Sequence, residues 1–226
     1  MRIAQSVFAA MLIVVAGSRV VGANEKASLT TMDASDFGPG GRIEIKNSFG
    51  DLRVVGWDQP RVEVMVVREV NSAEGSVAKT DAEARLRKTV VAVQLASPGH
   101  MIIATDSPQK AKSGLDLTYE IRVPRKTDLV VNHDTGDVRI EDIEGDVSAT
   151  CKTGEITVDL PANISFSIDA AAENGDVESI ASGAPGLSEH KLYARVGVGD
   201  IVVRPPNAGS SRDDADEFRP LVIDII

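Results

Sequence analysis

The stretch Gly136–Val158, GDVRIEDIEGDVSATCKTGEITV, repeats one short unit three times and decides the fold class. The unit is a glycine, an acid, an aliphatic residue, any residue and then usually another aliphatic. It begins at Gly136, Gly145 and Gly154, nine residues apart. Glycine adopts turn conformations that other residues resist, and aspartate favours the same turns by bonding its own backbone. Alternate aliphatic side chains then lie on one side of a strand. The stretch therefore predicts short strands separated by tight turns.

The same unit recurs outside this stretch, with an early copy at Gly50 and late copies at Gly175 and Gly199. The gaps from Gly154 to Gly175 and from Gly175 to Gly199 are 21 and 24 residues. Repeated short strands with turns in register stack into a β-solenoid, in which each coil buries the apolar face of the next. Two strands per coil predict a coil of about 18 to 24 residues. An irregular β-sandwich is the alternative. The predicted structural turn residues are Gly50, Asp51, Gly136, Asp137, Gly145, Asp146, Gly154, Gly175, Asp176, Gly199 and Asp200.

Patterns in the rest of the chain complete an all-β fold with one short helix. Alternating aliphatic and polar residues predict several half-buried strands. They run over residues 42–45, 52–55, 61–70, 90–95, 101–105, 117–123 and 163–171. The segment Thr80–Thr89, TDAEARLRKT, is rich in helix formers and can be capped by Thr80 or Asp81, so it predicts the helix. Aromatic residues make up only 4% of the chain, which suits strands and turns better than a helical core.

The chain divides into four parts. Residues 1–23 predict a secretory signal peptide, with Arg2, the apolar run Val7–Gly17 and cleavage after Ala23. A membrane anchor is the alternative, but the run is short and Arg19 interrupts it. Residues 24–39 read as a polar leader and 40–204 as the β-repeat domain. Residues 205–226 form a tail rich in Pro, Gly and Asp, whose last residues, 221–226, are expected to add a strand over the open end of the solenoid.

The net charge and the single cysteine limit the classes of binding partner and the covalent links that we expect. The chain has 24 basic and 34 acidic residues, and removing Arg2 and Arg19 leaves 22 basic residues and a net charge of −12. A chain this acidic is not expected to bind nucleic acid or anionic lipid. No cysteine stands at the end of the apolar run, so no lipid attachment there and no stable membrane anchor is expected after cleavage. Cys151 is the single cysteine, which excludes an internal disulfide and predicts a small buried side chain.

No motif in the sequence points to catalysis, a cofactor or a metal. The three histidines, His100, His133 and His190, lack a nucleophile elbow or zinc spacing, and His133 reads as part of a polar turn. A pair of carboxylates acting on a polysaccharide stays open as an alternative. A calcium-stabilised roll is another, although each turn offers one glycine and one acid where that repeat needs more ligands. Trp57 is either a stacking platform for a glycan or a side chain packed over a turn.

These residues resemble the bacterial "putative adhesin" family, a group of exported domains of unknown function. The resemblance covers residues 38–204. It rests on Gly40–Ile45, on Gly50–Val54 with the Gly56–Asp58 turn, on Tyr119–Pro124, and on the later glycine–acid units. It implies an adhesive or scaffolding role and brings no catalytic residues. Because one fold hosts many functions, the resemblance alone does not decide the function.

The sequence therefore predicts an exported, non-catalytic β-solenoid of the bacterial cell envelope. Its expected location is the periplasm, the cell surface or the medium. The expected partner is an envelope or surface component, either a glycan or a protein. The polar positions expected to face outward are Arg139, Glu141, Ser148, Thr150, Lys152, Thr157 and Asp159.

Overall fold

The computed structural model describes residues 13–15, 27–70, 90–106, 115–162, 164–179 and 190–205. Within these ranges the chain forms 16 β-strands and no helix. The strands are β1 (Ile13–Val15), β2 (Ala27–Asp36), β3 (Arg42–Asn47), β4 (Asp51–Trp57), β5 (Arg61–Val70), β6 (Val90–Ser97), β7 (His100–Asp106), β8 (Leu115–Pro124), β9 (Asp128–Thr135), β10 (Val138–Glu141), β11 (Val147–Thr153), β12 (Ile156–Asp159), β13 (Phe166–Asn174), β14 (Val177–Ser179), β15 (His190–Val198) and β16 (Ile201–Arg204).

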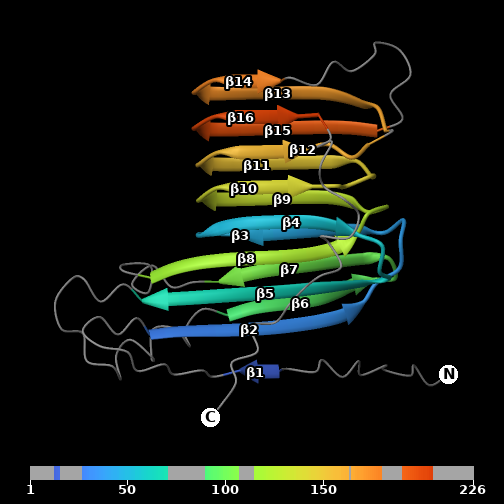
Figure 1. The fold of residues 1–226 in the computed structure, drawn as a ribbon, viewed down its shortest axis with the longest axis vertical. Helices are drawn as coiled ribbons and strands as arrows, with labels where there is room; N and C mark the ends of the chain where they lie inside the picture. Colours follow the sequence, from blue (N-terminus) through green and yellow to red (C-terminus); the bar gives the residue numbers. More distant parts are fainter. Residues whose placement is uncertain are drawn as a thin grey trace.

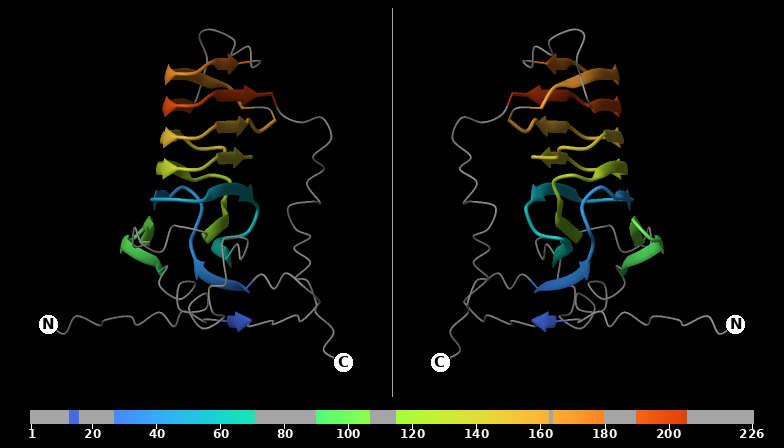
Figure 2. Two further views of the ribbon diagram at one scale, coloured as in Figure 1. Left: turned by 90° about the vertical axis from the view of Figure 1, so that its left-hand side faces the viewer. Right: turned by 90° about the vertical axis from the view of Figure 1, so that its right-hand side faces the viewer.

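The strands build two sheets that face each other along the length of the molecule (Figure 1). The larger sheet has the order β1-β2-β5-β8-β4-β10-β12-β16-β14, and the smaller has the order β13-β15-β11-β9-β3-β7-β6. A strand of the smaller sheet and the next strand of the larger sheet make one coil, as in β9–β10 and β11–β12. Neighbouring coils pair in parallel, and the core lies between the two sheets (Figure 2). The all-β stack predicted from the repeats is confirmed.

The coils do not stack in the order of the chain. The coil β3–β4 lies between β7–β8 and β9–β10, and the late coil β15–β16 lies between β11–β12 and β13–β14. Below β7–β8 the parallel pattern ends, because β5 pairs antiparallel with β8 and with β2, and β6 pairs antiparallel with β7. The molecule is therefore a parallel solenoid with two inserted coils and an antiparallel lower end (Figure 1).

Alternation in the sequence places the core. In β3 the side chains of Ile43 and Ile45 are fully buried, while Glu44 and Lys46 face outward. The same inward phase holds for Leu129 and Val131 of β9, which are also fully buried. Burying a side chain of this size stabilises the fold by about 1.5–3 kcal/mol relative to its exposure. Each coil adds such residues, so the core runs through the whole stack.

Segments assigned from the sequence to the leader and to the signal peptide contain strands in the structure. Residues 27–36, read from the sequence as part of a polar leader, form β2 and pair along their whole length with β5. None of the side chains of residues 28–36 is fully buried, so this strand lacks the aliphatic alternation of the core strands. Ile13–Val15, inside the predicted signal peptide, pairs with β2. The predicted helix at residues 80–89 and the tail from residue 206 lie outside the described residues.

Candidate functional site

Five glycine corners lie one above another where the smaller sheet passes into the larger one. All five have positive φ angles, between 101° and 153°. In spatial order they are Gly50, Gly136, Gly154, Gly199 and Gly175. A Cβ atom on Gly154 would overlap the carbonyl oxygen of Gly136, and each other glycine above Gly50 meets its lower neighbour in the same way. Both the backbone angle and the close stacking therefore require glycine at these corners.

Three of the acids that follow these glycines accept a backbone amide of the next coil, whereas Glu155 accepts the hydroxyl of Thr157 in its own coil. The carboxylate of Asp137 accepts the amide of Glu155 at 2.9 Å, and that of Asp51 accepts the amide of Asp137 at 3.2 Å. Asp200 accepts the amide of Asp176 at 2.8 Å. The acids thus form a column in which carboxylates serve as hydrogen-bond acceptors between coils. Within the described ranges no three His, Cys, Asp or Glu side chains gather as a metal site would require.

Gly145 and Asp146 lie at the opposite corner, between β10 and β11. The φ angle of Gly145 is not in the left-handed region, and its close neighbour is the backbone of Thr127. The amide of Asp146 donates to Asp128 at 3.1 Å, and its carboxylate accepts the amide of Lys191 at 2.9 Å. The nine-residue period is therefore half a coil, and the equivalent position one coil later is 18 residues away.

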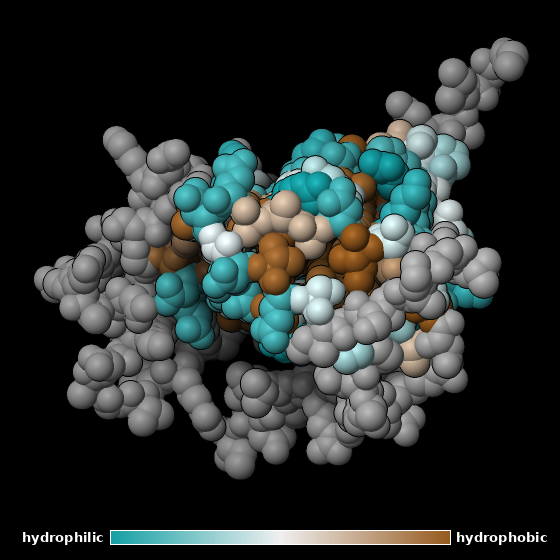
Figure 3. Space-filling model, turned by 90° about the horizontal axis from the view of Figure 1, so that it is seen from above, coloured by the Kyte–Doolittle hydropathy of each residue, from teal (hydrophilic) through white to brown (hydrophobic). Residues whose placement is uncertain are grey.

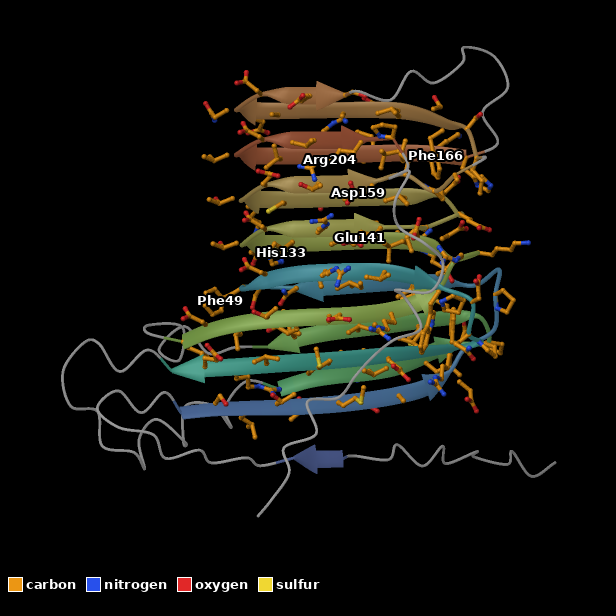
Figure 4. All side chains as sticks on the ribbon, viewed as in Figure 1. Phe49, His133, Glu141, Asp159, Phe166 and Arg204 are labelled. Carbon is orange, nitrogen blue, oxygen red and sulfur yellow. The ribbon has the colours of Figure 1, made fainter. Side chains whose placement is uncertain are left out.

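A ladder of ion pairs crosses the outer face of the larger sheet. Arg53 of β4 binds Glu141 of β10 through two contacts of 2.8 and 2.9 Å. Arg139 of β10 binds Glu141 at 2.8 Å and Asp159 of β12 at 2.8 Å. Glu141, Asp159 and Arg204 stand in register on β10, β12 and β16 (Figure 4). Arg139 thus joins the two carboxylates on adjacent strands, and Arg53 adds a second partner to Glu141. We call Arg53, Arg139, Glu141 and Asp159 the charged ladder.

The environment of Glu141 keeps its carboxyl group ionised. Burial raises the pKa of Glu141, but the hydrogen bonds and charges of Arg53 and Arg139 outweigh this and hold the pKa below its ordinary value. The same pairing raises the pKa of Arg53. Asp159 is buried to 7% exposure although its strand position faces outward, and its Oδ1 makes no hydrogen bond. The lowered pKa of Glu141 fits a carboxylate that pairs with two arginines.

Trp57 packs as a structural side chain at the edge of a small cavity. It is 4% exposed, and its Nε1 donates to the carbonyl of Arg61 at 2.9 Å. The guanidinium carbons of Arg61 and Arg122 lie 5.0 and 5.8 Å from its ring centroid. The cavity has a volume of about 170 Å³ and is lined by Pro39, Trp57, Asp58, Gln59, Pro60, Pro124, Arg125, Lys126 and Glu144. The exposure and contacts of Trp57 favour packing over a turn, not a platform for a glycan.

Cys151 and His133 are buried side chains on neighbouring coils. They are register partners on β11 and β9, and Asn47 of β3 follows in the same row. Burial raises the pKa of the Cys151 thiol and lowers the pKa of His133. Neither ring nitrogen of His133 makes a hydrogen bond of normal geometry. Cys151 is buried as predicted, whereas His133 lies in a strand and not in the polar turn that the sequence suggested.

The sequence placed Arg139, Glu141 and Asp159 outward but did not bring them together, and it did not single out Arg53. Glu141 and Asp159 are 18 residues apart, as are His133 and Cys151, so each pair is separated by one coil. That spacing was the signal that could have found both pairs. His100 and His190 lie at the beginnings of β7 and β15, while His133 lies near the end of β9, so the three histidines do not share a site.

Comparison with solved structures supports the fold. The chain is similar to a "putative cell adhesion protein" from Clostridium sporogenes, with a TM-score of 0.50 and 16% sequence identity over 78% of this chain and 99% of that one. A "putative adhesin" from Bacteroides fragilis aligns with a TM-score of 0.26 and 10% identity, over 77% of this chain and 96% of that one. No family model and no curated protein matches the sequence. The first likeness shows that the chain shares the fold of the Clostridium protein.

Proposed function

We propose that this chain is an exported, non-catalytic protein of the bacterial cell envelope that serves adhesion or scaffolding through the outer surface of its coils. The observation that carries the proposal is the charged ladder. Its four side chains are tied across three successive coils, which gives a flat, rigid surface of alternating charge. Such a surface offers many weak polar contacts to an extended glycan or protein partner.

Two further features support this role. The predicted signal peptide directs the chain out of the cytoplasm. The solenoid holds its outer side chains on strands paired on both sides, so the surface changes little when a partner binds. The fold shared with the Clostridium protein agrees with the proposal, and the function described for that protein remains a statement about that protein.

A carboxylate pair acting on a polysaccharide is the second candidate, and the adjacency of Glu141 and Asp159 is what favours it. Against it, both carboxylates bind Arg139 at 2.8 Å, and the pKa of Glu141 is lowered. In the proposed role the pair is part of a binding surface. The enzyme hypothesis predicts release of reducing ends from an envelope polysaccharide, and loss of that release in Glu141→Gln.

The test is capture of envelope components by the exported full chain. Purified envelope fractions and a glycan array are presented to the parent and to the double variant Arg53→Gln and Arg139→Gln. The matched control is the double variant Lys152→Gln and Arg195→Gln, which removes two cations from the outer face of the smaller sheet. We expect at least tenfold weaker capture by the ladder variant and unchanged capture by the control. Equal loss in both variants, or no capture by the parent, would contradict the proposal.

A further inference from the structure

At one end of the solenoid, no described strand lies beyond the coil β13–β14. The coil β13–β14 is the outermost strand pair of both sheets, so β13 and β14 each have one edge without a strand partner among the described residues. Phe166 of this coil is buried, but the other inward side chains of β13, Ile168, Ala170 and Ala172, are only partly covered, and Val177 of β14 is 43% exposed. Figure 3, which looks down on this end, shows apolar side chains gathered in the middle with polar ones around them. An open edge of this kind is a template for another strand.

The edge strand lacks the common protections. Phe166–Asn174, FSIDAAAEN, contains no lysine and no proline, and its pairing with β15 shows no bulge. Asp169 is neutralised by Arg195 of the neighbouring strand, through contacts of 2.8 and 2.9 Å. Glu173 is the remaining acid on this edge. The strand is therefore able to pair with a suitable partner strand at modest electrostatic cost.

The sequence of β13 is complementary to itself in antiparallel pairing. With a two-fold axis at Ala170, Ile168 lies opposite Ala172 of the second copy, and each Ala170 lies opposite the other. On the outer face Asp169 lies opposite Ala171, and Glu173 lies opposite Ser167. Large side chains thus face small ones, and no two like charges are directly opposite. Moving the axis to Ala171 would set Asp169 against Glu173, so charge selects the first register.

We propose that two copies of this chain associate end to end through β13, which joins their smaller sheets into one continuous sheet. The interface is isologous, since the same strand serves both copies. A nine-residue strand is about 30 Å long at 3.3 Å per residue. With two sheets packed about 10 Å apart, the end covers about 300 Å² on each copy and about 600 Å² in total, below the roughly 1,200 Å² of a standard stable interface. The dimer is therefore concentration-dependent and dissociates on dilution. This inference does not depend on the adhesive role.

The test uses a charge swap at Ala171, which faces outward on β13 and is exposed. In the proposed register residue 171 lies opposite Asp169 of the second copy. We expect Ala171→Asp to shift the dimer midpoint to at least tenfold higher concentration, and Ala171→Lys to shift it to lower concentration. Ser28→Asp on β2, at the other end of the molecule, adds the same charge and should leave the midpoint unchanged.

The readouts are sedimentation velocity over a wide concentration range and small-angle scattering of the full chain, with circular dichroism to verify that each variant is folded. An end-to-end dimer has close to twice the longest dimension of the monomer, whereas a side-by-side dimer does not. A monomer at all concentrations, a side-by-side dimer, or equal effects of Ala171→Asp and Ala171→Lys would each overturn the proposal. Protection from hydrogen exchange, in dilute monomer, of the β13 amides that point away from β15 would also overturn it, because the outer edge would then be covered within one chain.

Discussion

At the residue scale, three glycines allow the cost of a positive φ angle to be measured separately from the cost of a steric overlap at the Cβ position. Gly154 has a φ of 139° and no room for a Cβ, Gly40 has a φ of 79° with open space around it, and Gly38 has neither constraint. We expect substitution by alanine to destabilise the protein by roughly 2–4 kcal/mol at Gly154, by about 1 kcal/mol at Gly40, and by less than about 0.5 kcal/mol at Gly38. Urea unfolding measures all three. Equal costs at Gly154 and Gly40 would show that the coils can move apart.

His133 makes stability depend on pH. Burial lowers its pKa in the folded chain below the ordinary value of about 6.5, so the unfolded chain binds the proton more tightly. The contribution of the neutral imidazole to stability is fully present above about pH 6.5 and is lost as the pH falls toward the lower folded pKa. We expect His133→Gln to flatten the pH dependence of the unfolding free energy below pH 6.5. Above pH 8 both proteins should show parallel curves, and a persistent slope below pH 6.5 in the variant would assign it to other groups.

At the element scale, the acid column stabilises one coil through the amide of the next. Asp200 accepts the amide of Asp176, whereas Asp176 ends the column and its carboxylate accepts no hydrogen bond from the described residues. We expect Asp200→Ala to destabilise the protein by about 1 kcal/mol and Asp176→Ala to change stability by less than half of that. Thermal and urea unfolding of both variants provide the measurement. A larger cost at Asp176 would indicate that its carboxylate serves another group.

The charged ladder should differ from an isolated surface ion pair. Replacing Arg139 by methionine leaves the buried carboxylate of Asp159 without its arginine partner, and we expect a loss of about 1–2 kcal/mol. Lys152 pairs with Asp134, and both side chains are well exposed, so Lys152→Met should cost less than about 0.5 kcal/mol. Unfolding in low and high salt distinguishes them further, because screening affects the exposed pair more. Equal losses of unfolding free energy in Arg139→Met and Lys152→Met would mean that the ladder does not act as a unit.

The strands were largely predictable because period-two alternation marks a strand with one buried face. Arg61–Val70 was expected as a strand and is β5, and the turn at Gly136 was readable from its glycine and acid. The sequence could not distinguish the corner at Gly136 from the opposite corner at Gly145. Both glycines begin a Gly-Asp-Val unit, but only Gly136 has a positive φ angle. The charged ladder was also hidden, since its partners are one coil apart and the coil length becomes certain only when the corners are assigned.

At the scale of the whole molecule, the order of the coils was beyond sequence reasoning. Every coil presents similar aliphatic residues to its neighbours, so alternation specifies which face is buried but not which coil lies next. The structure places β15–β16 between two coils that precede it in the chain. Such an insertion depends on which strand edges of neighbouring coils pair best, and these edges exist only in the assembled stack.

The inserted coil allows a direct test of how stability is distributed. In a solenoid each coil is stabilised mainly by its nearest neighbours. β13 and β14 pair only with β15 and β16 among the described strands. A chain that ends after Ser179 should therefore lose hydrogen-exchange protection in β13 and β14, while β9 and β10, which keep both neighbours, stay protected in the same sample. If β13 and β14 remain protected, they pair directly with β11 and β12 when the later coil is missing. In that case the late coil inserts into a stack that has already closed, and it must displace existing strand pairs to do so.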